Sequence, residues 1–321
     1  MFRRPSRRVV VRDIGVQSNA DLAERLGQRE QGLCIVNQRA HARDLFAAIR
    51  HLPGARHLST CMHAVHRMRL LAEIREDLTA GRPCRVISTS LIEAGVDIDF
   101  PTVLRASAGL DQIAQAAGRC NREGKRAAAD SEVLVFKATE HDVIQSLKKN
   151  AESGAEILRS HAADPFSPDA IQAFFEQLYW RRQDGQKDGL DEHGVLAACE
   201  GAARDLDFPF ASIAGWMRFI DDAMLPVIVP VEDDGKVTAL LTKLRFVEKP
   251  GGIARELQRF TVGVPQKVRS ELLAKGLAET VRAQEFGDQF VVLLNLDLYK
   301  PDIGLDWREP SFIAAERLIV G

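Results

Sequence analysis

Short apolar runs alternate with amphipathic segments over the first part of the chain. Residues 33–36 form a continuous apolar run typical of a buried parallel strand, and residues 85–89 and 132–136 predict a second and a third strand. Between them, residues 40–50 and 63–80 predict helices, each followed closely by Gly and Pro. The apolar positions at helical spacing in the second helix are Val65, Met68, Leu71 or Ala72, and Leu78. This alternation predicts βαβ units and an α/β domain with helices on both faces of a parallel sheet.

The pattern changes after Lys137. Residues 140–203 predict an almost entirely helical connector, with one aromatic-rich helix at 174–180 that Ser167-Pro168-Asp169 starts. A mixed α+β region follows, with an apolar run at 226–231, helices around 236–247 and 266–276, and a strand at 290–296. We therefore expect three parts: an α/β domain at 1–139, a helical linker at 140–205 and a smaller α+β C-terminal domain at 206–321.

Composition is that of an ordinary soluble globular protein, with 45% hydrophobic and 27% charged residues. No apolar run is long enough for a membrane span, and the basic N-terminus lacks the apolar stretch of a secretory signal, so a cytoplasmic location is expected. The five cysteines are widely spaced without a C-x-x-C pair, which argues against disulfides and cysteine zinc sites. The net charge of −2 does not decide nucleic-acid binding, because translocating enzymes concentrate positive charge in one channel.

Two arginines offer phosphate chemistry. Arg119 and Arg122 follow Gly118 at the end of an alanine-rich helix, residues 113–117, and are expected to project in nearly the same direction. A guanidinium stays protonated, and its planar fork matches phosphate oxygens. The pair therefore suits the charge on a transferred phosphoryl group. A solvated helix end, with cations favourable to the macrodipole, stays open as the alternative.

An earlier segment, residues 88–99, places polar groups after a predicted strand. Ligands of open α/β sheets bind at the carboxyl ends of the strands. There Thr89 could bond a nucleic-acid phosphate, and Asp97 a ribose hydroxyl or the neighbouring arginine; Gly95 lies in the loop between them. An ordinary βα turn is the alternative, but two such segments on one sheet favour a functional site.

These segments resemble known helicase motifs. Ser88–Asp97 is similar to motif V of superfamily 2 helicases, and Gln115–Arg122 to motif VI, with Gln115, Gly118, Arg119 and Arg122 in the matching places. Taken at greater length, the same two segments resemble the corresponding sequences of the helicase-nuclease of type I CRISPR systems. Further similar stretches are Ile35–Arg39 (motif IV), Leu58–Arg67, Leu257–Val262 and Leu298–Leu305. The resemblance reaches from about residue 30 to the C-terminus.

The resemblance implies a RecA-like second motor domain, a helical linker and a C-terminal domain that closes over single-stranded DNA. The full family protein adds an N-terminal HD nuclease and a first RecA-like domain. It is recruited to the target-bound Cascade complex. Using ATP and Mg²⁺, it pulls the displaced strand 3′ to 5′ and degrades it. This degradation is the antiviral step of CRISPR interference. The implied catalytic contacts are Arg119 and Arg122; nucleotide contacts are these two with Gly95, Asp97 and Gln115; strand contacts are Asn37, Arg39, Arg67, Ser88 and Thr89. Departures from the family pattern are Ser90, Ala116 and Cys61.

Several parts of a complete motor are missing from the sequence. It has no G-x-x-x-x-G-K-[ST] cradle for the β- and γ-phosphates. Asp191-Glu192-His193 resembles a Walker B box but follows a polar stretch, so we interpret it as a decoy. Glu140-His141-Asp142 lacks partners for an HD metal centre and is expected to start the helical connector. His63 and His66 lack a third ligand, so we interpret them as packing or surface residues and expect no metal site.

Two main interpretations of function are open, one as part of an enzyme and one as a binding module. The first is the arginine-finger lobe of a CRISPR helicase-nuclease, unable to hydrolyse ATP alone. The second is a non-enzymatic module that binds DNA or Cascade. The C-terminal half of an unrelated superfamily 2 helicase is a third, which the C-terminal similarities disfavour. The aromatic helix at 174–180 is expected to be a core stripe rather than a stacking platform for bases.

Overall fold

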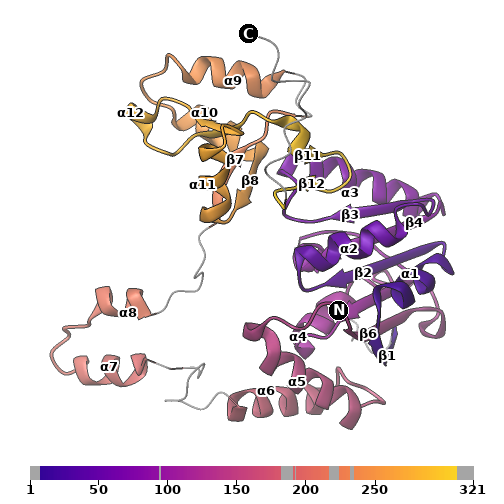
Figure 1. The fold of residues 1–321 in the computed structure, drawn as a ribbon. Helices are drawn as coiled ribbons and strands as arrows, with labels where there is room; N and C mark the ends of the chain where they lie inside the picture. Colours follow the sequence, from indigo (N-terminus) through magenta and orange to yellow (C-terminus); the bar gives the residue numbers. More distant parts are fainter. Residues whose placement is uncertain are drawn as a thin grey trace. The chain divides into compact units, whose positions relative to one another are not determined.

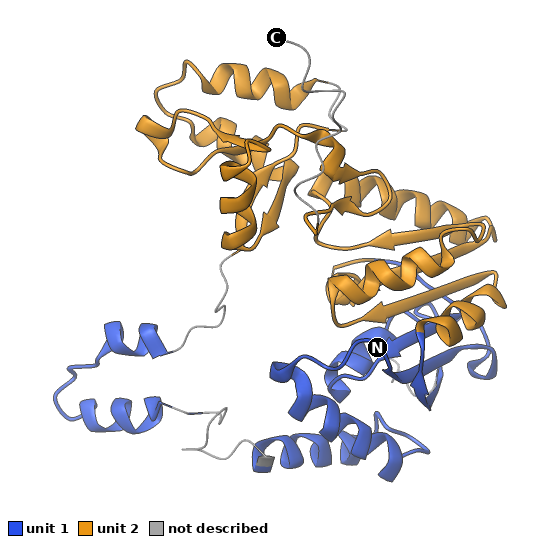
Figure 2. Cartoon of the chain, viewed as in Figure 1, with its two compact units in different colours: residues 1–18, 97–222 blue, residues 19–96, 223–321 orange. Residues whose placement is uncertain are grey.

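The computed structural model describes residues 8–93, 95–181, 191, 193–216, 224–231 and 235–308. The chain divides into two compact units, each built from two separate stretches of sequence (Figure 2). The first unit joins residues 1–18 to 97–222, and the second joins 19–96 to 223–321. The domain boundaries expected from the sequence stay a prediction.

Six strands form a parallel sheet with the order β1-β6-β5-β2-β4-β3 (Figure 1). The pattern predicted β2, β4 and β6, and the expected α/β class is confirmed. It missed β1 and β3, which lie at the ends of this order, and β5, which contains the buried Arg105. Edge strands need not be apolar on both faces, so their sequences lack a continuous apolar run. The strands are β1 (Val10–Gln17), β2 (Gln31–Val36), β3 (Ala55–Leu58), β4 (Cys84–Thr89), β5 (Thr102–Ala106) and β6 (Glu132–Ala138).

The first unit adds helices to β1, β5 and β6. They are α4 (Leu110–Ala117), α5 (Gln145–Ser160), α6 (Pro168–Arg181), α7 (Val195–Ala202) and α8 (Phe210–Trp216). The predicted helical connector is therefore confirmed over its described residues. Helix α5 begins at Gln145 rather than at Glu140, so the acidic segment precedes the helix. At Gly154 an added Cβ would lie 2.4 Å from the Ala108 oxygen, so a glycine is needed where α5 meets that backbone.

Helix α6 starts as predicted, since the Ser167 hydroxyl accepts a hydrogen bond from the Ala170 N–H (3.2 Å). The expected core stripe is only partly present. Phe174 and Leu178 are buried, whereas Trp180 is 71% exposed. Nothing among the described residues assigns a partner to that exposed aromatic face.

In the second unit, α1 (Asn19–Gly27), α2 (Arg39–Ile49) and α3 (Ala64–Thr79) accompany β2, β3 and β4. The predicted apolar face of α3 is only partly right, since Val65, Leu71 and Leu78 are partly buried but none of the predicted positions is fully buried. The helix buries His66, Ile74 and Asp77, while Met68 is 59% exposed. Asp77 can be buried because two cations neutralise it: Arg56 lies 2.6 Å and Arg82 2.7 Å from its carboxylate oxygens.

The C-terminal residues of this unit form a four-stranded mixed sheet with the order β8-β7-β10-β9. Strand β10 is parallel to β7 and antiparallel to β9. The expected α+β character is confirmed, although β10 is shorter than the predicted strand at 290–296. The elements are β7 (Leu225–Ile228), α9 (Lys236–Leu244), α10 (Gly251–Leu257), β8 (Thr261–Val264), α11 (Gln266–Ala274), β9 (Ala278–Thr280), α12 (Ala283–Phe286), β10 (Val291–Leu293), β11 (Tyr299–Lys300) and β12 (Gly304–Leu305).

The β11–β12 hairpin packs on the helices of the same unit. The Tyr299 hydroxyl lies 2.8 Å from His66 Nδ1, and its ring stacks on His63 with centroids 5.2 Å apart. The Leu305 N–H donates to the Cys61 carbonyl (2.8 Å). Both histidines therefore serve packing, as the sequence analysis favoured.

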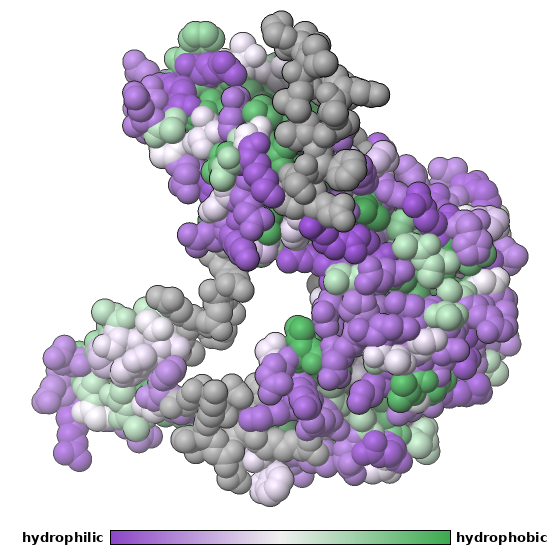
Figure 3. Space-filling model, viewed as in Figure 1, coloured by the Kyte–Doolittle hydropathy of each residue, from purple (hydrophilic) through white to green (hydrophobic). Residues whose placement is uncertain are grey.

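On the face that Figure 3 shows, hydrophilic residues cover most of the surface and hydrophobic residues appear as small patches. Within the described parts of the chain, no helix combines the length and apolarity that crossing a membrane requires.

Gly304 tests the hairpin contact. Its φ is +78°, and an added Cβ would lie 2.3 Å from the Cys61 oxygen. Gly276 has a similar φ of +66° but nothing within 4 Å. We expect Gly276→Ala to lower the free energy of unfolding by on the order of 1 kcal/mol, from backbone strain alone. Gly304→Ala should cost roughly 2–4 kcal/mol, because a backbone clash is added. Urea denaturation of both variants measures the difference; equal costs would contradict the contact.

Two buried histidines predict a dependence of stability on pH. Burial lowers the pKa of His57 and of His66 to about 4, from an ordinary value of 6.5. The unfolded chain then binds more protons than the folded chain between pH 6.5 and 4. Stability should fall as pH decreases through that window, by up to about 1.4 kcal/mol per pH unit for each histidine, and this contribution is constant below it. His57→Leu should reduce the slope relative to wild type in denaturation at pH 7 to 4.5. His51→Gln, at an exposed position, is the control; an unchanged slope in His57→Leu would refute the assignment.

Candidate functional site

Three neighbouring parallel strands of the second unit end at one open cavity. Parallel pairing of β2 and β3 with β4 brings their carboxyl ends to the same edge of the sheet. The cavity has a volume of about 610 Å³ and is lined by Asn37, Gln38, Arg39, Thr60, Thr89, Ser90 and Leu91. The structure therefore brings together three of the residues predicted for strand contact: Asn37, Arg39 and Thr89.

The chemistry of this cavity suits a sugar-phosphate backbone. It offers amides, hydroxyls and one guanidinium, which are the donors that proteins commonly direct at phosphate oxygens. Sequence analysis did not assign Gln38 or Thr60 to the site. Thr60 follows β3 closely, so recognising that edge strand would have identified it.

Two other predicted strand contacts do not line this cavity. Ser88 is fully buried, and its hydroxyl donates to the Thr89 carbonyl oxygen (2.9 Å). Arg67 is half-buried on α3. Burial lowers its pKa, and the smaller, opposing effect of nearby Tyr299 does not reverse this shift. Roles for these two residues in strand binding stay predictions.

In the first unit, an ion pair joins the two helicase-like segments. Arg122 Nε lies 2.7 Å from Asp97 Oδ1, with 42% and 79% of the respective side chains exposed. Of the two partners expected for Asp97, the neighbouring arginine is the one observed. An exposed pair of this kind contributes only about 0–1 kcal/mol. A bound anion can therefore take over the guanidinium at little cost.

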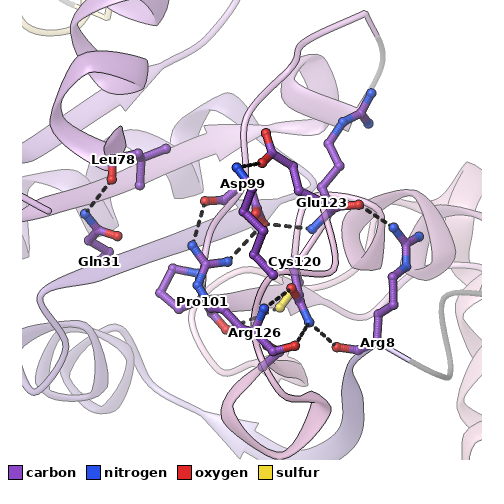
Figure 4. A network of polar contacts seen from close by, with 12 residues as sticks. Arg8, Gln31, Leu78, Asp99, Pro101, Cys120, Glu123 and Arg126 are labelled. Atoms are coloured by element: carbon purple, nitrogen blue, oxygen red, sulfur yellow. Dashed lines mark hydrogen bonds and ion pairs between the residues drawn. The ribbon is translucent and has the colours of Figure 1, made fainter. Parts of the chain in front are cut away.

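The loop that carries Arg122 is held by polar contacts that the sequence analysis missed (Figure 4). Asp99 accepts a hydrogen bond from the Arg122 backbone N–H (2.8 Å). It also forms an ion pair with Arg126 (3.1 Å). Asn121 is buried with a φ of +46°, and its side-chain amide donates to the carbonyls of Arg8 and Arg126, both at 2.8 Å. An Asn three residues before Gly124 was the available signal, since Asn tolerates positive φ better than most residues.

Arg119 and Arg122 differ in their surroundings, and the helical geometry on which the expected common direction rests is absent, so that expectation stays a prediction. Helix α4 ends at Ala117, and the backbone turns through positive φ at Asn121 between the arginines. Helical i, i+3 geometry therefore does not apply to them. Arg119 is 7% exposed, and its carbonyl accepts from the Phe100 N–H (2.9 Å).

The remaining predicted nucleotide contacts lie near these segments in sequence. Gln115 is exposed on α4. Gly95 has a φ of +69°, a backbone angle that a glycine adopts without strain, and there is open space around it. Between the arginines lies Cys120, whose burial raises the pKa of its thiol to about 12 and keeps it protonated. It is therefore a packing residue, not a nucleophile.

The residues present fit part of an ATP site. An exposed guanidinium can meet a phosphate, but the sequence has no P-loop cradle. The Walker B-like string has a structural use, since Asp191 accepts from the N–H groups of Val195 (2.5 Å) and Leu196 (2.9 Å) at the start of α7; Glu192 lies outside the described residues. The described portion of the chain also contains no group of three His, Cys, Asp or Glu side chains arranged to hold a metal.

Comparison with known proteins identifies similar sequences. Residues 28–125 match the family described as CRISPR-associated nuclease/helicase Cas3, C-terminal. The protein of that name from Haloferax volcanii is 44% identical over 75 residues, which are 23% of this chain and 8% of that protein. Its namesake from Methanothermobacter thermautotrophicus is 25% identical over 210 residues, or 60% of this chain and 25% of that protein. The matches thus span a quarter or less of these relatives.

Solved structures share the fold. T. fusca Cas3 with ADP has a TM-score of 0.58 at 15% identity, covering 95% of this chain and 43% of that one. A structure titled CRISPR RNA-guided surveillance complex, pre-nicking, has a TM-score of 0.55 at 14% identity, covering 89% and 41%. The predicted resemblance to the C-terminal half of the CRISPR helicase-nuclease is confirmed.

Two aspartates test the division between loop architecture and ligand contact. Asp99→Asn removes a charged acceptor for Arg126 and the Arg122 N–H, and should lower the free energy of unfolding by roughly 1–3 kcal/mol. Asp97→Asn, two residues earlier, weakens the exposed ion pair with Arg122 and should cost less than about 1 kcal/mol. Urea denaturation compares them. A larger cost for Asp97→Asn than for Asp99→Asn would contradict these roles.

Proposed function

The chain carries a Cas3-like C-terminal domain over residues 28–125, and from that premise we propose that it is the C-terminal motor half of a CRISPR-associated, ATP-dependent DNA helicase-nuclease. In this role it supplies an arginine finger and single-strand contacts for 3′ to 5′ translocation. It hydrolyses ATP only together with an N-terminal half that provides the phosphate cradle, the first RecA-like domain and the HD nuclease.

The ion pair between Asp97 and Arg122 carries this proposal. It joins the motif V-like and motif VI-like segments at 2.7 Å and leaves a guanidinium exposed. Arginine fingers stabilise the charge of a transferred phosphoryl group. Arg122 is the finger by this argument, and buried Arg119 supports the loop beside it. Solved relatives titled Cas3 with ATP, AMPPNP and ADP support a nucleotide role, with Mg²⁺ as the usual companion of ATP.

The cavity at the ends of β2, β3 and β4 is the proposed strand site. Asn37, Arg39 and Thr89 direct an amide, a guanidinium and a hydroxyl toward it. Contacts of this kind position a strand without reading its sequence. That property suits a translocating enzyme, which must accept any sequence. The relative titled as a surveillance complex supports Cascade as the partner that delivers the strand.

A non-enzymatic DNA- or Cascade-binding module is the second candidate. The cavity favours it, because all of its lining residues belong to the second unit and neither motif VI-like arginine is among them. If single-strand affinity falls steeply with salt and survives loss of both Arg119 and Arg122, binding does not depend on the nucleotide site.

Complementation tests the motor function. The purified chain should show no DNA-stimulated ATP hydrolysis, because it lacks the phosphate cradle. Adding the N-terminal half of a Cas3 relative should restore hydrolysis. Arg122→Ala should then reduce the restored rate by about a thousandfold or more, the usual effect of losing an arginine finger. Phosphate release in the presence of single-stranded DNA is the readout.

Arg12→Ala is the matched control, since Arg12 also forms an exposed ion pair in the first unit, with Glu132 at 2.9 Å. It should leave the restored rate within a factor of about two. Hydrolysis by the chain alone, or full activity of Arg122→Ala, would reject the proposal.

A further inference from the structure

The guanidinium of Arg39 lies over an aromatic ring from the C-terminal end of the described chain. Its guanidinium carbon lies 5.2 Å from the centroid of the Trp307 ring. Arg39 is the first residue of α2 and lines the cavity at the strand ends. Trp307 follows β12 and belongs to the same compact unit. A residue of the C-terminal region thus touches the cation of the proposed strand site.

Residues 306–308 are attached to α2 by three consecutive contacts. Asp306 forms an ion pair with Arg43, and Arg308 lies 3.3 Å from Asp44 Oδ1. The Asp306 N–H also donates to the Leu298 carbonyl (2.8 Å), which ties the segment to its own hairpin. Trp307 lies between these anchors and contacts α2 through Arg39.

Trp307 is also fixed from its other side. It packs against a buried cluster of the C-terminal sheet that includes Val227, Val264 and Leu293. An indole held by a core cannot move freely with the arginine. The stack therefore connects the position of the Arg39 guanidinium to the C-terminal sheet.

The stack leaves the hydrogen-bonding capacity of Arg39 available. A guanidinium carries five N–H donors, so contact with one aromatic ring leaves donors for phosphate oxygens. An unrestrained arginine loses much side-chain freedom when it grips a phosphate, and a stacked one has already lost part of it. Trp307 can thus strengthen a phosphate contact without touching the ligand.

We infer that Trp307 is a positioning residue that holds Arg39 for contact with a phosphate of single-stranded DNA. This inference rests on the proposed strand site. It adds that the C-terminal region takes part in strand binding through one defined side chain.

The test is binding of a fluorescein-labelled oligo(dT) to the full chain, followed by anisotropy over a range of salt concentrations. Arg39→Ala should weaken binding about three- to tenfold and reduce the salt slope by about 0.7, the loss of one single-strand phosphate contact. Trp307→Ala should weaken binding about two- to tenfold and also reduce the slope. Trp307→Phe, which keeps a ring, should recover part of the affinity. In the Arg39→Ala background, Trp307→Ala should have no further effect, because its action passes through Arg39.

Leu273→Ala is the matched control for a loosened core. Leu273 packs against the same buried cluster but does not line the cavity. It should lower the melting temperature as Trp307→Ala does and leave oligonucleotide affinity within about twofold. Comparable weakening by Leu273→Ala, or an additive effect in the double variant, would overturn the inference and leave the strand site standing.

The remaining outcomes separate the inference from the proposed function. If Arg39→Ala binds normally while Asn37→Ala and Thr89→Val weaken binding, the strand site is retained and the role of Trp307 is rejected. If the wild-type chain does not bind oligo(dT) at low salt, both the strand site and the positioning role fail.

Discussion

Parallel pairing of strands is the constraint on which the proposed strand site depends. All strands of a parallel sheet end at the same edge, so the residues that follow them come together although they are distant in sequence. Here β2, β4 and β3 deliver Asn37, Thr89 and Thr60 to one cavity. Strand β2 is mostly apolar and buried, whereas the residues at and just beyond the three strand ends include polar ones. The sheet supplies rigidity, and the loops supply chemistry.

The loop that carries Arg122 shows how a charged site can be both firm and responsive. Asp99 and Asn121 bind the loop backbone through hydrogen bonds, and Arg126 forms an ion pair with Asp99; the contacts of Asn121 and Arg126 are partly buried and costly to break. The pair of Arg122 with Asp97 is exposed and weak by comparison. The backbone is therefore fixed while the guanidinium can exchange its carboxylate for a phosphate. A guanidinium held by strong contacts could not exchange partners in this way.

Within the second unit, the C-terminal hairpin contacts α2 and α3 at several places that differ in chemistry. Tyr299 meets two buried histidines, Leu305 bonds a backbone carbonyl, and Trp307 stacks on Arg39. Burial lowers the pKa of one of them, His66, to about 4, which makes this packing sensitive to acid. The stack reaches the cavity itself. Packing and ligand contact are thus connected through residues that neither a strand nor a helix pattern singles out.

The sequence by itself determined the α/β class, the strands with continuous apolar runs, most helix positions and the helicase-like segments. Those features depend on local periodicity or on contiguous residues, which a sequence displays directly. Tertiary structure alone decided that His66 and Asp77 rather than Met68 are buried on α3, and that Arg119 and Arg122 have different surroundings. It also placed Trp307 beside Arg39. Burial of a polar residue depends on a partner far away in the chain, such as Tyr299 for His66, and local pattern carries no information about that partner.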